Sequence, residues 1–128
     1  MKVLLDTHTL IWATLKPNRL SRGASAAIAD PRTEVLVSAA SAWEIATKVR
    51  LGKMPESEPL ERRFFEALDE AGYVLLSIDA ETALRAGRLL GNHRDPFDRI
   101  LAAHAVALDI PIISNDAKLD LFPLRRIW

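Results

Sequence analysis

Four acidic side chains stand at comparable places along the sequence, near the points where apolar β-type runs give way to helical spacing. They are Asp6 at the end of KVLLD, Glu44 in the first turn of the helix predicted after EVLVSAA, Asp98 in the first turn of the helix predicted from HRDPFDRILAAHA, and Asp116 just past IPIIS. Gathered in one pocket, such carboxylates repel each other and raise one another's pKa values unless a cation neutralises them. Hard oxygen ligands suit Mg²⁺ or Mn²⁺, and such a metal site commonly acts on phosphate esters.

Capping is the competing explanation for each of these residues. Asp6 and Asp116 can each accept a hydrogen bond from the first turn that follows, and Ser41 with Glu44 has the S-x-x-E form of a capping box. Taken singly, the carboxylates are better explained as caps. Taken together, they favour a metal site.

The motif around Asp98 combines both explanations. Asp95 followed by Pro96 has the form of an N-cap with proline at the first helical position. Asp98 then falls in the third position, near the positive end of the helix dipole. We therefore predict that Asp95 mainly sets the start of the helix and that Asp98 binds the metal.

The elements that must position these residues form an alternating pattern. Five runs rich in Val, Ile and Leu, without polar alternation, predict a mostly parallel sheet of four to five strands with helices on both faces. The strands are expected near residues 2–6, 34–38, 73–78, 110–114 and 124–128, and the helices near 7–14, 21–30, 41–52, 80–90 and 95–105. The segment 54–72 is expected to form a Pro-marked loop followed by a further helix. Within 54–72, Phe64, Phe65 and Leu68 are expected on the inner face of one amphipathic helix. Because the carboxyl ends of parallel strands share one edge, the four carboxylates can meet there.

Composition limits the remaining possibilities. The chain has 128 residues and 49% hydrophobic composition, which predicts one domain over residues 1–128 with a substantial core. It contains no cysteine, which excludes disulfides and thiolate metal ligands and suits the cytoplasm. No uncharged run approaches the roughly 18 residues that a membrane span needs. Seventeen basic and seventeen acidic side chains balance, so RNA or DNA binding would need a local patch.

Several other polar and aromatic residues are weaker candidates. Lys48, Arg94 and Arg99 are candidates for phosphate contacts, although Lys48 is also spaced to pair with Glu44 along a helix. The histidines His8, His93 and His104 show no zinc-ligand spacing and are left out of the catalytic set. Trp12 and Trp43 lie in apolar helical patterns, which favours core positions over base stacking.

The ordered set of motifs resembles the PIN-domain family, in particular the VapC-type toxins of bacterial toxin–antitoxin pairs. The similar blocks are LLDTHTLIW, SAASAWEIATKVRLGK, HRDPFDRILAAHA, IISND and the closing IW, and they cover nearly the whole chain in family order. The resemblance implies a PIN-like α/β/α sandwich and a Mg²⁺- or Mn²⁺-dependent endoribonuclease acting on RNA, often a structured RNA such as tRNA. It also implies an antitoxin partner and a homodimer.

The family's acidic positions map onto Asp6, Glu44, Asp98 and Asp116, which the resemblance implies as catalytic metal ligands. Asp95 belongs to a DPFD variant of the motif and is expected to act first as a cap and second as an outer-shell group. Ser114 stands where family members often carry a small hydroxyl residue that helps to orient water or metal.

Two alternatives remain open at this point. A receiver-type signalling module also holds Mg²⁺ in an acidic pocket, and Asp79 after YVLLSI would be its phosphate acceptor, but the expected late lysine is missing. A catalytically silent subunit that only binds antitoxin is the other alternative. Antitoxin binding needs exposed apolar surface, to which Leu10, Ile11, Leu15 and Leu20 can contribute, although at least half of these are expected in the core.

Overall fold

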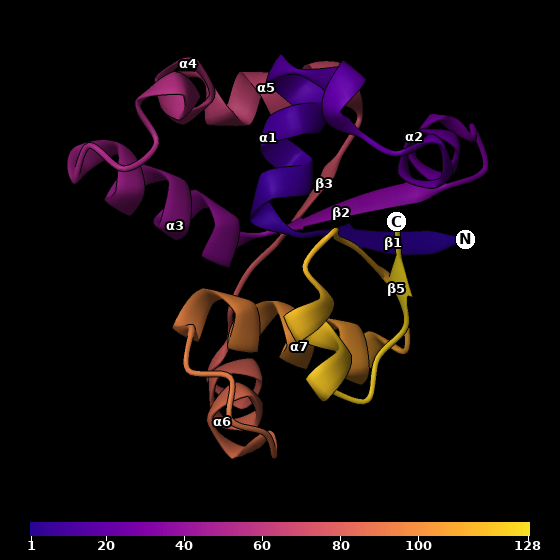
Figure 1. Cartoon of the computed structure of the whole chain (residues 1–128), viewed down its shortest axis with the longest axis vertical. Helices are drawn as coiled ribbons and strands as arrows, with labels where there is room; N and C mark the ends of the chain where they lie inside the picture. The colour runs from indigo at the N-terminus through magenta and orange to yellow at the C-terminus, as the bar shows by residue number, and fades with distance from the viewer.

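The computed structural model describes all residues, 1–128, and is built on one five-stranded parallel sheet (Figure 1). The strand order is β3-β2-β1-β4-β5, so the first strand lies at the centre. Every neighbouring pair is parallel, which confirms the predicted sheet. The strands are β1 (Lys2–Leu5), β2 (Glu34–Ser38), β3 (Val74–Leu76), β4 (Ile112–Ile113) and β5 (Arg126–Ile127).

Helices cover both faces of this sheet, giving the three-layer α/β/α arrangement. The side that lies above the sheet in Figure 1 carries α1 (Thr7–Leu15), α2 (Arg22–Ala29), α3 (Ala39–Arg50), α4 (Glu58–Arg62) and α5 (Phe64–Ala71). The opposite side carries α6 (Ala80–Arg88) and α7 (Pro96–Leu108), together with the short 3₁₀ turn η3 (Ala117–Leu121). None of the helices has the length and hydrophobicity needed to cross a membrane.

The two layers of helices bury two separate apolar clusters. In β1, Val3 and Leu5 belong to the cluster under α1 to α5, whereas Leu4 belongs to the cluster under α7. All three side chains are fully buried. Successive side chains of a strand point to opposite faces, so a sheet covered on both sides needs apolar residues at every position. This is why the strand runs lack polar alternation.

The start of α3 differs from the predicted capping box. Ser38, and not Ser41, is the N-cap, and its hydroxyl accepts a hydrogen bond from the N–H of Ala40 at 3.0 Å. The Ser41 hydroxyl instead meets the Thr7 hydroxyl at 3.0 Å in a buried contact between α3 and α1. The capping-box explanation of Glu44 is therefore wrong.

The segment 54–72 also differs from the prediction. It forms the two helices α4 and α5, preceded by a 3₁₀ turn at Pro55–Ser57, and not one amphipathic helix. Phe64 and Leu68 are buried as expected, but Phe65 is 72% exposed. Phe64 and Leu68 are four residues apart in α5 and share its buried face, whereas Phe65 is one position on and points away from that face.

The apolar residues near the N-terminus lie mostly in the core. Leu10 and Ile11 are buried, as expected for at least half of the set, and Leu15 and Leu20 pack against the same cluster at partial exposure. These side chains therefore do not form a free apolar groove.

Candidate active site

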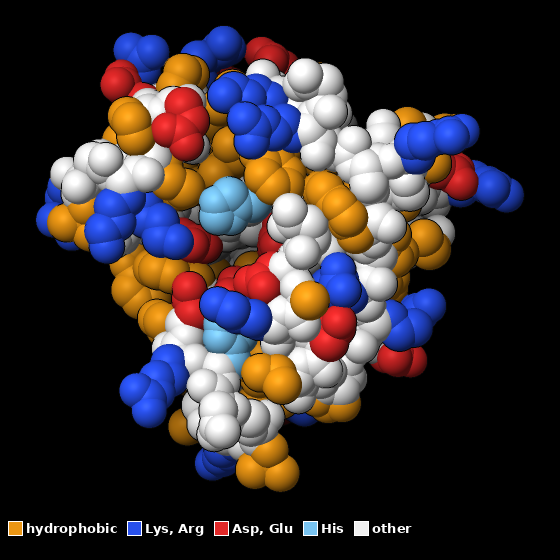
Figure 2. Space-filling model, viewed as in Figure 1, with side chains coloured by type: hydrophobic (Ala, Val, Ile, Leu, Met, Phe, Trp, Pro, Cys, Tyr) orange, Lys and Arg blue, Asp and Glu red, His pale blue; other side chains and the backbone are white.

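The four predicted carboxylates line one polar pocket of about 450 Å³. Asp6 follows β1, Glu44 lies in the helix that follows β2, Asp116 follows β4 and Asp98 lies in the first turn of α7. Figure 2 shows acidic side chains gathered in a hollow near the centre of one face, with histidine side chains on both sides and basic side chains around it. The prediction that distant acids meet at the carboxyl edge of the sheet is confirmed.

Asp6 is fixed by hydrogen bonds at the start of α1. Its carboxylate accepts a hydrogen bond from the N–H of Thr9 at 2.8 Å, so Asp6 is also the N-cap of this helix. The Thr9 hydroxyl donates to the carbonyl oxygen of Ile113 at 2.8 Å and so ties α1 to β4. Asp6 is only 6% exposed, and this burial raises the pKa of its carboxyl, although hydrogen bonding from Ser114 and Thr9 acts to lower it.

Ser114 connects Asp6 to the other end of the pocket. Its hydroxyl accepts a hydrogen bond from the N–H of Asp116 at 2.9 Å, and Ser114 is fully buried. The Asp116 carboxylate in turn accepts from the N–H of Lys118 at 3.0 Å and caps η3. Ser114 thus holds the backbone of Asp116 and acts to lower the pKa of Asp6.

Glu44 forms an ion pair with Lys48 one turn later in α3. Glu44 is 4% exposed and Lys48 also lines the pocket. The ion pair with Glu44, which was the alternative to a phosphate contact for Lys48, is therefore present. A buried carboxylate needs such a partner, because an unpaired buried charge is costly.

The carboxyl pKa of Asp98 is raised well above its ordinary value. Burial raises its pKa to about 6, and the negative charges of Asp95 and Glu44 add to the rise, whereas a hydrogen bond from His93 lowers it. Asp95 accepts hydrogen bonds from the N–H groups of Phe97 at 2.9 Å and Asp98 at 3.2 Å, which confirms it as the N-cap of α7.

His93 is a site residue that the sequence patterns do not indicate. Its Nε2 lies 2.8 Å from an Oδ of Asp98. His93, Asp98 and Asp116 each offer one potential ligand atom, and these three atoms lie within 4.8 Å of one another. His93 lies in the loop between α6 and α7, so helical spacing carries no information about its position. The signal available was only its closeness in sequence to Asp98.

The other two histidines differ in their surroundings. His8 lines the pocket but is exposed, and its ring lies 5.7 Å from that of Trp12. His104 is 5% exposed within α7, and its Nε2 has no hydrogen-bond partner. His8 thus lines the pocket, His93 lies beside it through its contact with Asp98, and His104 lies in the packed interior of its layer.

Arg99, predicted as a phosphate contact, donates its hydrogen bonds within the protein. Its guanidinium donates to the carbonyl oxygens of Ala86 at 2.9 Å and His93 at 2.9 Å, and also to that of Leu89. It lies over the Phe122 ring, 5.6 Å from the ring centroid. Arg99 therefore holds the loop that carries His93, whereas Arg94 in that loop is exposed.

Trp43 differs from its predicted core position, because it is 54% exposed. Its ring meets that of Phe97 edge to face, with centroids 4.6 Å apart. The Nζ of Lys48, which lines the pocket, lies 6.0 Å from the centroid of the Phe97 ring, so the exposed Trp43 ring lies near the edge of the pocket without lining it. Trp12 is half-buried and packs against Trp128.

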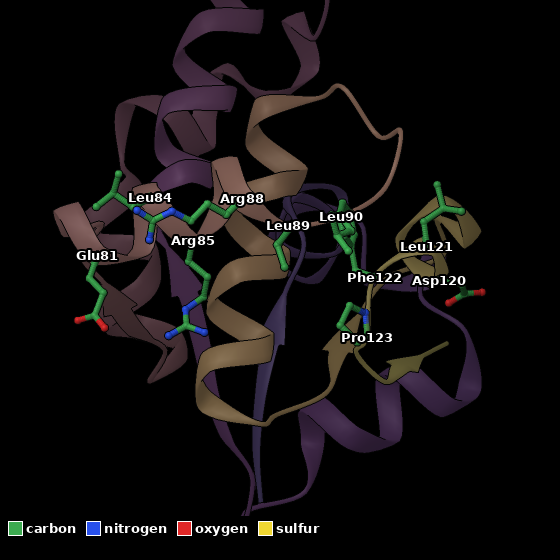
Figure 3. Close-up of a pocket in the computed structure, with 10 residues that line it drawn as sticks. All are labelled: Glu81, Leu84, Arg85, Arg88, Leu89, Leu90, Asp120, Leu121, Phe122 and Pro123. Carbon is green, nitrogen blue, oxygen red and sulfur yellow. The ribbon is translucent and has the colours of Figure 1, made fainter.

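A larger cavity of about 850 Å³ lies away from the carboxylates, between α6 and the segment 120–123 (Figure 3). Leucine side chains make up much of its wall, and Figure 3 places its two acidic residues, Glu81 and Asp120, at opposite ends. It therefore lacks the convergent polar groups that metal or acid–base chemistry requires.

The residues of the smaller pocket fit a hard divalent cation. Carboxylate oxygens predominate there, and the raised pKa values of Asp6 and Asp98 show that burial opposes their ionised forms. A bound cation would offset that cost. The chemistry of the donors favours Mg²⁺ or Mn²⁺.

Comparisons with known proteins agree with this geometry. A stretch of 61 residues is 46% identical to Ribonuclease VapC16 of Mycobacterium tuberculosis (strain ATCC 25618 / H37Rv), and it spans 47% of this chain and 43% of that protein. The match thus covers less than half the length of that relative.

Two solved structures show the same fold across nearly the whole chain. VapBC2 from Rickettsia felis, bound to a DNA fragment from their promoter, superposes with a TM-score of 0.67 at 18% identity, over 98% of this chain and 97% of that one. VapBC-1 from nontypeable Haemophilus influenzae gives a TM-score of 0.60 at 22% identity, over 98% and 96%.

The PIN domain family model matches residues 3–123, a range that contains the four predicted carboxylates, strands β2 to β4 and all of β1 but its first residue. With the parallel sheet and the acidic pocket at its carboxyl edge, this match shows that the chain belongs to the PIN domain family.

Proposed function

We propose that this protein is a metal-dependent endoribonuclease that hydrolyses RNA phosphodiester bonds and acts as the toxin of a VapC-type toxin–antitoxin pair. The observation that carries the proposal is the convergence of Asp6, Glu44, Asp98 and Asp116 on one pocket. Membership of the PIN domain family and the partial match to a protein named as a ribonuclease support it.

Asp6, Glu44, Asp98 and Asp116 are the residues proposed to hold Mg²⁺ or Mn²⁺. A divalent ion bound there supplies charge neutralisation at a phosphate oxygen and a more acidic bound water. The protein's own contribution is to fix these residues: Thr9 anchors the Asp6 carboxylate, Lys48 pairs with Glu44, and Ser114 holds the backbone of Asp116. Asp95 sets the start of α7 and thereby orients Asp98.

The substrate would be bound beside these carboxylates by cationic and aromatic groups. Lys48 lines the pocket, and exposed Arg94 lies one residue after His93. Trp43 offers an exposed ring on which an unpaired base can stack, which is how proteins commonly bind single-stranded RNA. Arg99 is the weaker candidate of the original three, because its donors serve backbone carbonyls.

The same proposal includes two protein partners: an antitoxin that blocks the site, and a second copy of the toxin in a homodimer. The proposed substrate is a structured RNA such as tRNA. The formal net charge of zero favours recognition through local geometry and the metal, because long-range attraction of RNA needs a positive field.

The receiver-type alternative is not favoured. Its phosphate acceptor would be Asp79, which is exposed, accepts a hydrogen bond from the N–H of Thr82 at 2.8 Å and caps α6. Asp79 is absent from the residues that line the acidic pocket. The silent-subunit alternative is opposed by the complete set of four carboxylates.

Cleavage of a small-RNA pool by the purified protein, with Mg²⁺, with Mn²⁺ and with a chelator, tests the proposal. We expect discrete products that need the metal. An Asp98→Asn variant that remains folded is the control and should give none. A folded wild-type protein that binds metal but leaves tRNA and other small RNAs intact would overturn the ribonuclease assignment.

A further inference from the structure

We propose that His93 is a nitrogen ligand of the metal ion in the carboxylate pocket, so that this protein has a mixed nitrogen and oxygen site that binds Mn²⁺ in preference to Mg²⁺. The inference deepens the proposed function and rests on it to the extent that both place a divalent ion in this pocket. It concerns a residue outside the four acidic positions of the family.

The separations between the three ligand atoms suit one ion. An octahedral ion with ligands at about 2.1 Å places neighbouring ligand atoms about 3 Å apart and opposite ones about 4.2 Å apart. The Nε2 of His93 and an Oδ of Asp98 are 2.8 Å apart, and the group formed with Asp116 lies within 4.8 Å. One ion can therefore contact all three residues with small side-chain movements.

The imidazole is also held in place before any ion arrives. Its side chain is 11% exposed, and its ring lies 5.9 Å from the ring of Phe122. The guanidinium of Arg99 fixes the backbone of the same residue by donating to the His93 carbonyl oxygen at 2.9 Å. A ligand fixed in this way loses little freedom when it binds.

The two ions differ in how well they accept such a ligand. Imidazole nitrogen suits transition metals, whereas Mg²⁺ takes oxygen ligands and keeps several waters. If Nε2 binds an ion, the neutral imidazole carries its proton on Nδ1. The hydrogen bond between His93 and Asp98 would then be replaced by an ion that both side chains bind. His93 should thus raise the affinity for Mn²⁺ more than that for Mg²⁺.

The rival role for His93 is an outer-shell group that only donates to Asp98. Loss of an outer-shell partner also weakens metal affinity, by about 10- to 100-fold. Affinity alone therefore does not separate the two roles. Direct coupling between the bound ion and a histidine nitrogen does separate them.

Electron spin echo measurements on the Mn²⁺-loaded protein test the proposal without RNA. We expect a nitrogen coupling that changes frequency when the histidines are labelled with ¹⁵N, is lost in His93→Gln and survives in His8→Gln. His8 is the matched control, because it lines the same pocket but lies outside the cluster of potential ligands. In parallel titrations, His93→Gln should weaken Mn²⁺ binding by about tenfold or more and Mg²⁺ binding by clearly less.

Mn²⁺ bound to the wild-type protein without a histidine nitrogen coupling would overturn the proposal, and so would a coupling lost in His8→Gln and kept in His93→Gln. The ¹⁵N comparison uses the wild-type protein, so it stands even where a variant fails to fold. RNA cleavage is measured separately: cleavage without the nitrogen coupling refutes the role of His93 alone, whereas the coupling without cleavage refutes the proposed ribonuclease alone.

Discussion

The Nε of Arg99 donates a hydrogen bond to the carbonyl oxygen of Ala86 at 2.9 Å, and so joins α7 to the end region of α6. The same guanidinium serves carbonyl oxygens of Leu89 and His93 in the connecting loop. Replacing Arg99 by Met keeps an unbranched apolar side chain but removes every side-chain donor, together with the guanidinium that lies over the Phe122 ring. We expect the free energy of unfolding to fall by about 2–4 kcal/mol, because bonds from a charged donor are lost and several carbonyl groups lose their partner.

Urea unfolding of Arg99→Met beside Arg94→Met measures this effect. Arg94 is exposed in the same loop, so its replacement should change the free energy of unfolding by no more than about 0.5 kcal/mol. Equal stabilities of the two variants would show that the guanidinium contributes nothing to holding the loop.

His104 should make the protein less stable in mild acid. Burial lowers the pKa of this imidazole below its ordinary value, although the charge of Asp79 acts in the opposite direction. The unfolded chain therefore takes up a proton near pH 6.5 before the folded protein does. The contribution of the neutral His104 to the free energy of unfolding is complete above that pH. It is lost as the pH falls, at up to about 1.4 kcal/mol per pH unit.

Unfolding free energies of the wild type, His104→Leu and His8→Leu at pH 5, 6, 7 and 8 check this prediction. The wild type and His8→Leu should lose stability between pH 6.5 and 5 more steeply than His104→Leu, because His8 is exposed. A pH profile of His104→Leu that parallels the wild type would contradict it.

The parts of the site that follow strands were predictable, because local patterns fix them. The apolar runs before Asp6 and Asp116 mark strand ends, and parallel strands bring their ends to one edge. The cap at Asp95 was predictable for a similar reason, since Asp-Pro before an apolar helical run is a local signal.

The parts that depend on distant contacts were not predictable. Both Ser38 and Ser41 suit an N-cap, and the choice depends on Thr7, which lies 34 residues before Ser41. His93 reaches Asp98 because Arg99 fixes the loop up to His93 through carbonyl groups, which carry no sequence signal. Trp43 lies on an apolar pattern, but its exposure depends on how α7 packs beside α3.

Asp98→Asn should abolish activity and still raise the stability of the metal-free protein. The carboxylate is partly buried beside Asp95 and Glu44, so removing its charge relieves repulsion. Cleavage should fall by at least about 100-fold, because a direct ligand matters more than an outer-shell one. Urea unfolding in chelator, with exposed Asp69→Asn as control, checks the stability. A metal-free Asp98→Asn protein less stable than wild type would show that the carboxylate is needed for folding.

Trp43→Ala should weaken RNA binding without changing metal binding. Stacking of a base on an aromatic side chain contributes about 1–3 kcal/mol, so the dissociation constant for single-stranded RNA should rise by about 5- to 100-fold. Binding is measured in the Asp98→Asn background, where the RNA is not cut. Phe65→Ala is the matched control, because Phe65 is 72% exposed but its ring meets Phe64 in α5, and not Phe97 at the start of α7. The same loss of affinity in both variants would show that the ring beside Glu44 has no special contact with RNA.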